Sequence, residues 1–499
     1  TLGGTFTHAG TNLTLTVNNS ATTTLSGDVA LSNNATAHIL TVTGTGNTTI
    51  GGNISNGSTS VSGITKTGNS TLSLSGTNNF TGAVAVSNGT LSLSGGNALA
   101  DTVNLTLSAT GALTLNASET VGSLTGVAAN TITLNSNSTL TSNTAASTSF
   151  LGNITGSGGL TKAGAGTLTL AGTNSYSGPT TINAGAISAG VLANGGANSS
   201  IGASDASAGN LVLGGGSLLY TGGNVTLDRN LTLSAATNST INVSTAATVL
   251  TLNGTTAATS GSLIKAGTGT LTLNGANQHS GNTTLTAGTL ILGNDNAAGD
   301  GTGTLVLNGG TLQASAARVL SNPVSLAANS TISGAANLNF TGNLTDTLSG
   351  NTTLTVSSTG LTAFGNVTLA PDAVASTFTL AGTGNVTVNG AIGEGAATGT
   401  SLVKSNTGTL TLSGSNSYTG NSTLTGGTVI VDSNSSFGSG GTVVLNGSTL
   451  QSNGSRTLSN PLSLAVNTTI SGAGNLNFTG NLTDTLSGNT TLTVSSTAL

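Results

Sequence analysis

Four lysines recur in nearly the same local sequence and are the most regular charges of the chain. Each precedes a short Thr/Leu alternation, followed by Gly, Asn and a second Gly. A row of such cations could bind a glycan or an acidic surface, whereas the alternative is a repeated local hydrogen bond or an exposed corner. Their separation of about a hundred residues puts them several stacked strands apart, on the order of 20 Å or more, so they cannot form one pocket, and we favour the structural role. These lysines are Lys66, Lys162, Lys265 and Lys404.

The same motif contains an aromatic position and a closing glycine, which we predict to be structural repeat positions. The aromatic residues are Phe80, Tyr176 and Tyr418, and the glycines are Gly82, Gly178, Gly281 and Gly420. In the copy at Lys265 the aromatic residue is replaced by His279, which weakens any role for the ring there.

Acidic residues are too scattered to predict a catalytic site. Cleavage of an acidic polysaccharide needs carboxylates, Arg or Lys clustered on one face. The closest group is Asp295 and Asp300, in a Gly/Asn-rich stretch that is typical of a solvated turn. Asp228 and Arg229 are adjacent, so on a strand they would face opposite ways. Two further pairs, Asp346 with Asp484 and Arg318 with Arg456, are copies one repeat apart, which indicates structure. We predict that the chain is not an enzyme.

No metal or cofactor site is predicted. His8, His38 and His279 lack metal-ligand spacing. The chain has no Cys, which excludes disulfides and thiolate metal sites.

The 499-residue chain is unusually poor in charge, with 7 basic and 12 acidic residues. Charged residues make up 4% of the chain, against roughly 25% in an ordinary soluble domain. Mean hydropathy of +0.22 with a net charge of −5 argues against disorder, and the lack of a basic cluster argues against nucleic acid. No apolar run approaches the roughly 18 residues that span a bilayer. The chain lacks a signal peptide, does not begin with Met and starts within the repeat pattern, so we expect a fragment of a longer polypeptide.

Alternation with a period of two dominates the sequence and predicts short strands with Leu, Val or Ile inward and Thr or Ser outward. Gly and Asn interrupt the runs, because both tolerate positive φ. Almost no segment has the periodicity of a helix. Clear examples of the alternation are residues 13–17, 72–74, 113–115, 132–134, 168–170, 231–233, 271–273, 354–356 and 410–412.

Many short strands are compatible with sandwiches, a propeller or a solenoid, and three observations favour the solenoid. The pattern continues without a composition shift, aromatic residues are only 2%, and small inward residues suit a thin core. We therefore predict an all-β fold: a right-handed parallel β-helix (β-solenoid) forming a single elongated rod. Each coil would hold two or three strands in roughly 20–25 residues, giving about 20 coils.

A longer repeat is superimposed on the coils. Residues 337–359 and 475–497 are identical, at an offset of 138. We predict one continuous solenoid over 1–499, with diverged coils in 1–261, a long repeat unit in 262–400 and a second, truncated copy in 401–499. A solenoid tolerates such duplication because each coil contacts only its neighbours.

The best copy of the motif spans residues 150–185, with Gly158-Gly-Leu-Thr-Lys162-Ala-Gly-Ala-Gly166-Thr-Leu-Thr-Leu170 and Asn174-Ser-Tyr176-Ser-Gly178. This string strongly resembles the autotransporter-associated β-strand repeat, also called the passenger-associated transport repeat. The resemblance covers about a quarter of the chain. It implies a parallel β-helical passenger that is exported across the outer membrane of Gram-negative-type bacteria, displayed at the surface or released, and active in adhesion or aggregation.

We therefore predict an extracellular or cell-surface protein, a stiff stalk or fibre that mediates adhesion or aggregation. The expected partners are surface glycans or other cells, together with self-association end to end or laterally. Three alternatives remain: a self-assembling filament or sheath exported by another route, an ice-binding solenoid, and a polysaccharide-degrading β-helix enzyme. The ice-binding alternative rests on the Thr-x-Thr pairs at 167–169, 270–272 and 409–411, although the intervening coils often lack the pair.

Overall fold

The computed structural model describes residues 1–370, 374–485 and 491–496. Within these residues the chain forms short strands joined by turns, and its helical content is a single 3-10 turn, η1 (Ala208–Asn210). Parallel strands stack coil on coil into a β-solenoid of about 23 turns, which confirms the predicted all-β solenoid. In this part of the chain no helix is long and apolar enough to cross a membrane.

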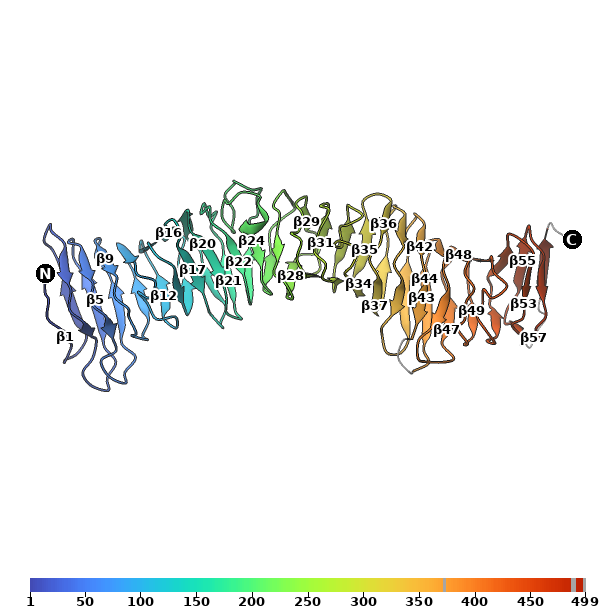
Figure 1. Cartoon of the computed structure of the whole chain (residues 1–499), viewed down its shortest axis with the longest axis horizontal. Coiled ribbons are helices and arrows are strands. Elements are labelled where there is room, and N and C mark those ends of the chain that lie inside the picture. The colour runs from blue at the N-terminus through green and yellow to red at the C-terminus, as the bar shows by residue number, and fades with distance from the viewer. Residues whose placement is uncertain (371–373, 486–490, 497–499) are drawn as a thin grey trace. The chain divides into compact units, whose positions relative to one another are not determined.

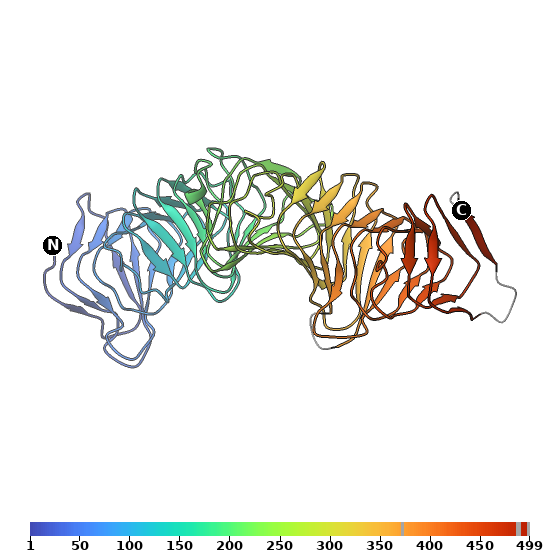
Figure 2. The same cartoon turned by 45° about the vertical axis from the view of Figure 1, so that its right-hand side comes forward.

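The residue contacts divide the chain into two compact units. Unit 1 comprises Thr1–Ser244 and Leu252–Ala257, and unit 2 comprises Thr245–Thr251 and Ala258–Leu499. Within each unit, strands that follow one another at intervals of a coil lie side by side (Figure 1). A view turned by 45° shows the chain of each unit winding through successive coils (Figure 2).

Unit 1 is built from parallel sheets in which each strand pairs with its counterparts in the preceding and following coils. One sheet has the order β15 (Ser123–Thr125), β12 (Asn104–Leu107), β10 (Val84–Val86), β8 (Gly63–Lys66), β5 (Ile39–Thr43), β2 (Leu13–Thr16). The second has the order β19 (Asn153–Gly156), β16 (Thr131–Leu134), β13 (Ala112–Leu115), β11 (Thr90–Leu93), β9 (Thr71–Leu74), β6 (Thr48–Ile50), β3 (Thr23–Leu25). The third has the order β14 (Glu119–Val121), β17 (Thr139–Ser142), β20 (Gly159–Lys162), β22 (Thr180–Ile182), β24 (Leu211–Leu213), β27 (Thr232–Leu233). A further run consists of β18 (Thr148–Phe150), β21 (Thr167–Leu170), β23 (Ala186–Ala189), β25 (Ser217–Tyr220) and β28 (Asn238–Val243). A separate short sheet consists of β1 (Phe6–Thr7), β4 (Val29–Ala30) and β7 (Ile54–Ser55).

Unit 2 presents three faces, each a run of parallel strands. The first run is β30 (Ser262–Ala266), β32 (Thr283–Leu285), β34 (Leu305–Asn308), β37 (Val324–Ala328), β40 (Leu344–Asp346), β43 (Val367–Leu369), β46 (Ile392–Glu394). The second is β31 (Thr270–Leu273), β33 (Thr289–Leu292), β35 (Thr311–Ala314), β38 (Ser330–Ile332), β41 (Thr352–Val356), β44 (Thr377–Gly382), β47 (Ser401–Lys404), β49 (Ser422–Leu424), β51 (Val443–Leu445), β54 (Leu462–Leu464), β57 (Leu482–Asp484). The third is β36 (Arg318–Leu320), β39 (Leu338–Phe340), β42 (Thr362–Phe364), β45 (Val386–Val388), β48 (Thr409–Leu412), β50 (Thr428–Val431), β52 (Thr449–Ser452), β55 (Thr468–Gly472), β58 (Leu492–Ser496).

The core is a set of aliphatic rows that run from coil to coil. In unit 1, Leu72, Leu91 and Leu113 lie in register on β9, β11 and β13, at offsets of 19 and 22 residues. All three are at most 1% exposed. Each such side chain contributes roughly 1.5–3 kcal/mol on burial, because it leaves water entirely. The residues between them, such as Ser73 and Thr114, face outward and are half-buried. This alternation follows the predicted pattern.

The two identical 23-residue stretches fold into equivalent strands where both are described. Residues 337–359 contain β39, β40 and β41, and the second copy contains β56 (Leu476–Phe478), β57 and β58. Their surroundings differ: Asp346 is buried between β37 and β43, whereas Asp484 is exposed on β57, the last strand of its run. Thr497, the last residue of the second stretch, lies outside the described residues. The division at 261, 400 and 499 stays a prediction from sequence.

Candidate functional site

The four lysines lie inside the solenoid and not on its surface. Each lies in an inward-facing row at or near the end of a strand: β8, β20, β30 and β47. Lys66, for example, stands in register between Val42 and Val86. All four lysine side chains are 0% exposed. The hypothesis that these lysines present a row of cations to a glycan is therefore wrong.

Backbone carbonyls accept the hydrogen bonds of each ammonium group. The Lys265 Nζ donates to the carbonyls of Ala266 (2.8 Å), Gly267 (2.8 Å) and Ala287 (3.0 Å). The three N–H groups thus find three acceptors, and none is a carboxylate. Two of the carbonyls belong to the two residues that follow the lysine, and the third belongs to the next coil. The side chain therefore closes its own turn and attaches it to its neighbour.

Lys404 repeats this arrangement, and Lys66 and Lys162 share its bond within the turn. The Lys404 Nζ donates to the carbonyls of Asn406 (2.6 Å), Gly408 (2.9 Å) and Gly426 (2.6 Å). Lys66 donates to Gly68, and Lys162 to Gly164. In each of these three copies an acceptor lies two residues after the lysine, and Lys265 also contacts its own, Gly267. We call this arrangement the lysine cage: the ammonium group with the carbonyls that accept its hydrogen bonds.

Some coils without the motif close the same kind of turn with a hydroxyl. Thr144 Oγ1 donates to the Ala146 carbonyl (2.7 Å), and Ser358 Oγ donates to the Gly360 carbonyl (3.0 Å). The i to i+2 bond is thus a general device of this solenoid. Lys265 and Lys404 also reach a carbonyl of the next coil, whereas these hydroxyl bonds of Thr144 and Ser358 stay within their own coil.

Burial lowers the pKa of every caged lysine, because the charged form loses water. The pKa of Lys265 and that of Lys404 fall to about 8, and the pKa values of Lys66 and Lys162 are lowered in the same direction. Near neutral pH Lys265 and Lys404 therefore still hold mostly ammonium groups, and each of these uses all three N–H donors.

A glycine with positive φ lies beside each cage in the following coil. Gly89 has φ of 67°, and a Cβ there would lie 2.8 Å from the Lys66 Nζ and 2.3 Å from the Gly68 carbonyl oxygen. Only glycine combines the left-handed conformation with this close approach. The equivalent residues are Gly185, Gly288 and Gly427.

The aromatic position pairs with the residue four places later. Tyr176 and Thr180 are both buried, and their hydroxyl oxygens lie 2.7 Å apart. Tyr418 and Ser422 have the same contact at 2.7 Å. In the first copy Phe80 is followed by Val84, so an apolar ring is matched with an apolar partner. The polarity of the ring and the polarity of the residue four places later therefore change together.

His279 takes the place of the tyrosine, contrary to our expectation that its ring has a weakened role. It is 0% exposed, and its Nε2 lies 2.9 Å from Thr283 Oγ1, as a tyrosine hydroxyl would. Thr283 in turn donates to the Ala298 carbonyl (3.0 Å). Burial lowers the pKa of His279 to about 4, so the ring is neutral at pH 7.

The motif asparagine continues a sheet across a turn. In the second copy the Ile154 N–H, on β19, donates to the Asn174 side-chain oxygen (2.8 Å). The Asn174 amide nitrogen donates to the Ser200 carbonyl (2.8 Å). One side-chain amide thus replaces a peptide group between the coil before and the coil after. Asn78 and Asn416 make the same pair of bonds, and Asn277 donates to the Ala297 carbonyl (2.7 Å).

The closing glycines are required by contact between coils. A Cβ on Gly178 would lie 2.4 Å from the backbone of Gly158 in the preceding coil. Gly82, Gly281 and Gly420 would each bring a Cβ within 2.3 Å of a carbonyl oxygen in the preceding coil. These positions have no room for any side chain, although their φ angles are ordinary.

The motif copies do not come together in space as one site. In unit 1, Lys66 lies on β8 and Lys162 on β20, which belong to different sheets. In unit 2, Lys265 lies on β30 and Lys404 on β47, again on different faces. Each copy is a local device that joins two or three coils.

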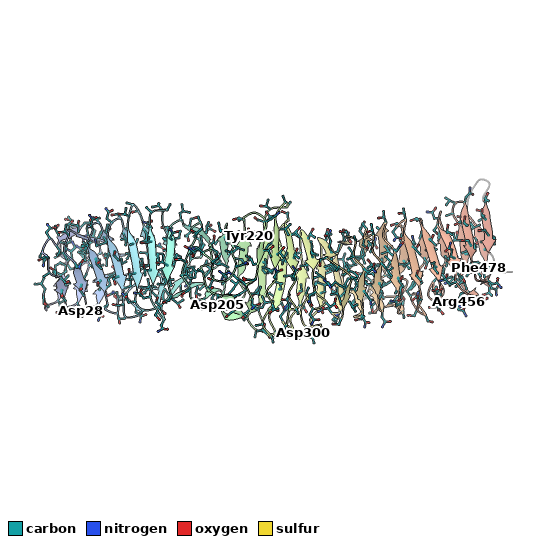
Figure 3. The ribbon with its side chains drawn as sticks, turned by 90° about the horizontal axis from the view of Figure 1, so that it is seen from above. Asp28, Asp205, Tyr220, Asp300, Arg456 and Phe478 are labelled. Carbon is teal, nitrogen blue, oxygen red and sulfur yellow. The ribbon has the colours of Figure 1, made fainter. Side chains whose placement is uncertain are left out.

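The acidic residues that the structure describes form no catalytic constellation. Asp300 is exposed, and its Oδ1 accepts from the N–H (2.9 Å) and the hydroxyl (2.6 Å) of Thr302, which lowers the pKa of the carboxyl. Asp295 accepts from the Val319 N–H of the next coil (3.2 Å). Within unit 1, Asp28 and Asp205 lie far apart along the stack (Figure 3). The carboxylates of Asp295 and Asp300 therefore hold turns.

One buried arginine and one buried glutamate also hold turns. Arg229 is 2% exposed and donates to the carbonyls of Ala193 (2.8 Å), Ser204 (3.0 Å) and Gly202 (3.0 Å), within the long connection between β23 and β24. The neighbouring Asp228 is exposed, as the alternation predicts. Glu119 is buried and accepts two backbone N–H groups of the preceding coil, and desolvation raises its pKa to about 7.

Histidines do not build a metal centre. His8 and His38 approach each other, with ring centroids 5.0 Å apart in an edge-to-face arrangement, a contact that sequence spacing did not indicate. Among the residues that the structure describes, no three His, Asp or Glu side chains gather to hold a metal ion.

Sequence reasoning missed the asparagine bridge and the ring partner. Both were visible as signals. The asparagine recurs in all four copies, and the residue four places after the ring is Val, Thr, Thr or Ser, in step with Phe, Tyr, His and Tyr. Nothing in the sequence alone shows that these positions touch.

The fold and the caged turns define a class of protein: a repetitive β-solenoid in which a motif fixes successive coils to one another. Four segments match the family model described as Passenger-associated-transport-repeat, at residues 64–93, 160–189, 263–292 and 402–431. A stretch of 90 residues is 46% identical to the adhesin BmaC autotransporter of Brucella suis biovar 1 (strain 1330). The match covers 18% of this chain and 3% of the length of that relative. No solved structure matches the chain. The findings support an autotransporter passenger-associated repeat protein, as the sequence motif predicted.

Proposed function

We propose that this chain is part of an adhesive, surface-displayed passenger, whose coils form a stiff stalk or fibre outside the cell. The observation that carries the proposal is the fourfold passenger-associated transport repeat, and the partial identity to a protein named as an autotransporter adhesin supports it. The lysine cages of Lys265 and Lys404 and the motif asparagines give a physical reason for stiffness, because they fasten a coil to its neighbours with side-chain bonds beyond the sheet ladder.

The same proposal makes the chain a non-enzymatic one. The carboxylates of Asp295 and Asp300 accept backbone hydrogen bonds, and the lysines, the natural cations for an acidic substrate, are buried. The partners would then be surfaces or other cells, and the location would be extracellular, after passage across an outer membrane.

Adhesion is tested by coating fluorescent beads with the purified chain and measuring their retention under flow. The surfaces are layers of host cells, bacterial cells, and glass coated with albumin. Retention above that of albumin-coated beads on at least one cellular surface is expected. Retention equal to the albumin control on every surface would refute an adhesive role for this chain. A parallel assay of sugar release from acidic polysaccharides would reveal an enzyme if products accumulated.

A further inference from the structure

Unit 2 carries a straight row of threonines on the outer face of one sheet. The row crosses β31, β33, β35, β38 and β41, one threonine per coil, in direct register. Parallel strands lie about 4.8 Å apart, so the five hydroxyls span roughly 19 Å. The side chains are half-buried and face outward. The row consists of Thr270, Thr289, Thr311, Thr331 and Thr355.

A second outward row runs beside the first, two residues further along each strand. Here Ile291 and Gln313 are half-buried and in register with Thr272, which is buried (8% exposed). The Gln313 amide nitrogen donates to Ser333 Oγ in the next coil (2.9 Å), so the glutamine lies along the sheet. The face thus combines hydroxyls, an amide and an aliphatic side chain. We call the two rows together the first face.

The tandem duplication repeats this face on a different sheet. The threonine row is Thr409, Thr428, Thr449, Thr469 and Thr493, on β48, β50, β52, β55 and β58. Beside it Thr411, Ile430 and Gln451 stand in register, and the Gln451 amide nitrogen donates to Ser471 Oγ (3.0 Å). This second face lies on the third run of unit 2, whereas the first lies on the second run. The two faces therefore point in different directions.

The chemistry of the faces selects an uncharged, hydroxyl-rich partner. Neither set of strands contains a charged residue. Threonine hydroxyls and glutamine amides exchange hydrogen bonds with hydroxyls, and the isoleucines offer contact to C–H groups. A charged polymer would lose water here without gaining a counter-charge. The repeat of about 4.8 Å along the row is close to that of a linear chain of pyranose rings.

We propose that each face binds one linear, uncharged polysaccharide along the direction of coil stacking, so that unit 2 cross-links two polysaccharide chains. The inference rests on the proposed adhesive function and deepens it by naming a surface and a ligand class. Binding to ice, the alternative ligand, would need flat rows of threonine. Ile291 and Gln313 interrupt the second row of one face, and Ile430 and Gln451 that of the other. In unit 1 the pair at 167–169 is lost in the next coil, where Ala186 and Ser188 follow.

The test uses the whole chain with suspended cellulose as the neutral polysaccharide and polygalacturonate as the charged one. Binding is measured by co-sedimentation, and cross-linking by the turbidity of dispersed cellulose. The variants are Gln313→Glu, Gln451→Glu and both together. Each places a carboxylate where the neighbouring serine hydroxyl can still donate to it, which protects the fold. Thr345→Glu, outward on β40 of the first run, is the matched control.

We expect the wild-type chain to bind cellulose and raise its turbidity. Each single variant should keep binding but lose turbidity, because one face remains. The double variant should bind about ten- to a hundredfold more weakly, because a carboxylate on each face would lose water beneath the sugar without gaining a counter-charge. Thr345→Glu should behave as wild type.

Four results would overturn the inference: no binding of the wild-type chain to cellulose, unchanged binding of the double variant, stronger binding to polygalacturonate, or thermal hysteresis in place of sugar binding. The bead-retention assay separates this failure from failure of the proposed function. If wild-type and double-variant beads are retained equally on cells, adhesion stands and the faces are not its site.

Discussion

Replacing Lys404 by methionine tests whether the lysine cage fastens coils together. Methionine keeps the length and packing of the side chain but removes the ammonium group. The Gly408 carbonyl also accepts the Thr428 N–H (3.3 Å), so the carbonyls of Asn406 and Gly426 bear most of the loss. Each buried acceptor left without its donor costs about 1–3 kcal/mol. The ammonium group no longer has to be desolvated, which offsets part of this cost. A net local loss of about 2–4 kcal/mol follows.

Native-state hydrogen exchange is the suitable assay, because a long solenoid does not unfold as one two-state unit. Peptides covering 402–431 should exchange about 30- to 700-fold faster in Lys404→Met, since 1.4 kcal/mol corresponds to a factor of ten. Peptides several coils away should be unchanged. Thr423→Val, on the outer face of β49, is the control and should shift protection little. Unchanged protection of 402–431 in Lys404→Met would refute the cage as a fastening device.

The same cage predicts a pH dependence with a defined sign. The pKa of Lys404 is about 8 in the folded chain, below its ordinary value of 10.5. Between these values the folded chain binds fewer protons than the unfolded chain, so stability rises with pH through this window. Below about pH 8 that gain is absent. Protection of 402–431, corrected for intrinsic exchange, should therefore increase from pH 8 to pH 10 in wild type and stay level in Lys404→Met; equal slopes would contradict the assignment.

Three further predictions concern the ring and the glycine. Phe80→Tyr alone should destabilise its coils by about 1–3 kcal/mol, because the added hydroxyl would be buried and Val84, at the partner position, has no hydroxyl. Adding Val84→Thr should recover much of the loss, and additive effects in this double-mutant cycle would contradict the pairing. His279→Tyr should remove the acid sensitivity of its coils. The pKa of the histidine is lowered from 6.5 to about 4 in the folded chain, so the wild-type chain loses stability as pH falls through that range. A melting temperature that drops equally in wild type and variant between pH 6.5 and 4 would argue against this role. Gly178→Ala should weaken or prevent folding of its coils, because the new Cβ would lie 2.4 Å from the backbone of the preceding coil. Gly209→Ala, whose Cβ would meet nothing within 4 Å, is the control and should leave the circular dichroism spectrum and the melting temperature unchanged. Similar behaviour of the two variants would count against the close approach.

Much of the fold follows from local sequence. The Leu/Thr alternation specifies strands and their inward face, because a one-residue slip would expose the whole core row. Small inward residues specify a narrow core, and the motif glycines specify close coils. The solenoid could therefore be predicted from segments such as 168–170 without any long-range information.

The inside of the motif could not be predicted so well. A lysine in a Thr/Leu-rich strand usually reads as exposed, since lysine is rarely buried. Its burial depends on carbonyls from its own turn and from the next coil, about 22 residues later in Lys404. Likewise the bond between His279 and Thr283 needs the turn geometry to bring the two together. The sheet on which each copy lies could not be predicted either, because it depends on the summed lengths of all preceding turns.

The placement of motif copies on different sheets bears on how such a gene can grow. Lys265 lies on the run that contains β30, and Lys404, its counterpart 139 residues later, lies on the run that contains β47. The duplicated segment is thus not a whole number of coils. Because each copy needs only its neighbouring coils, a recombination event need not land in phase to give a foldable product. An out-of-phase duplication places the copied surface on a different face of the solenoid. Repeated duplication can therefore produce proteins that present one surface in several directions without any new sequence.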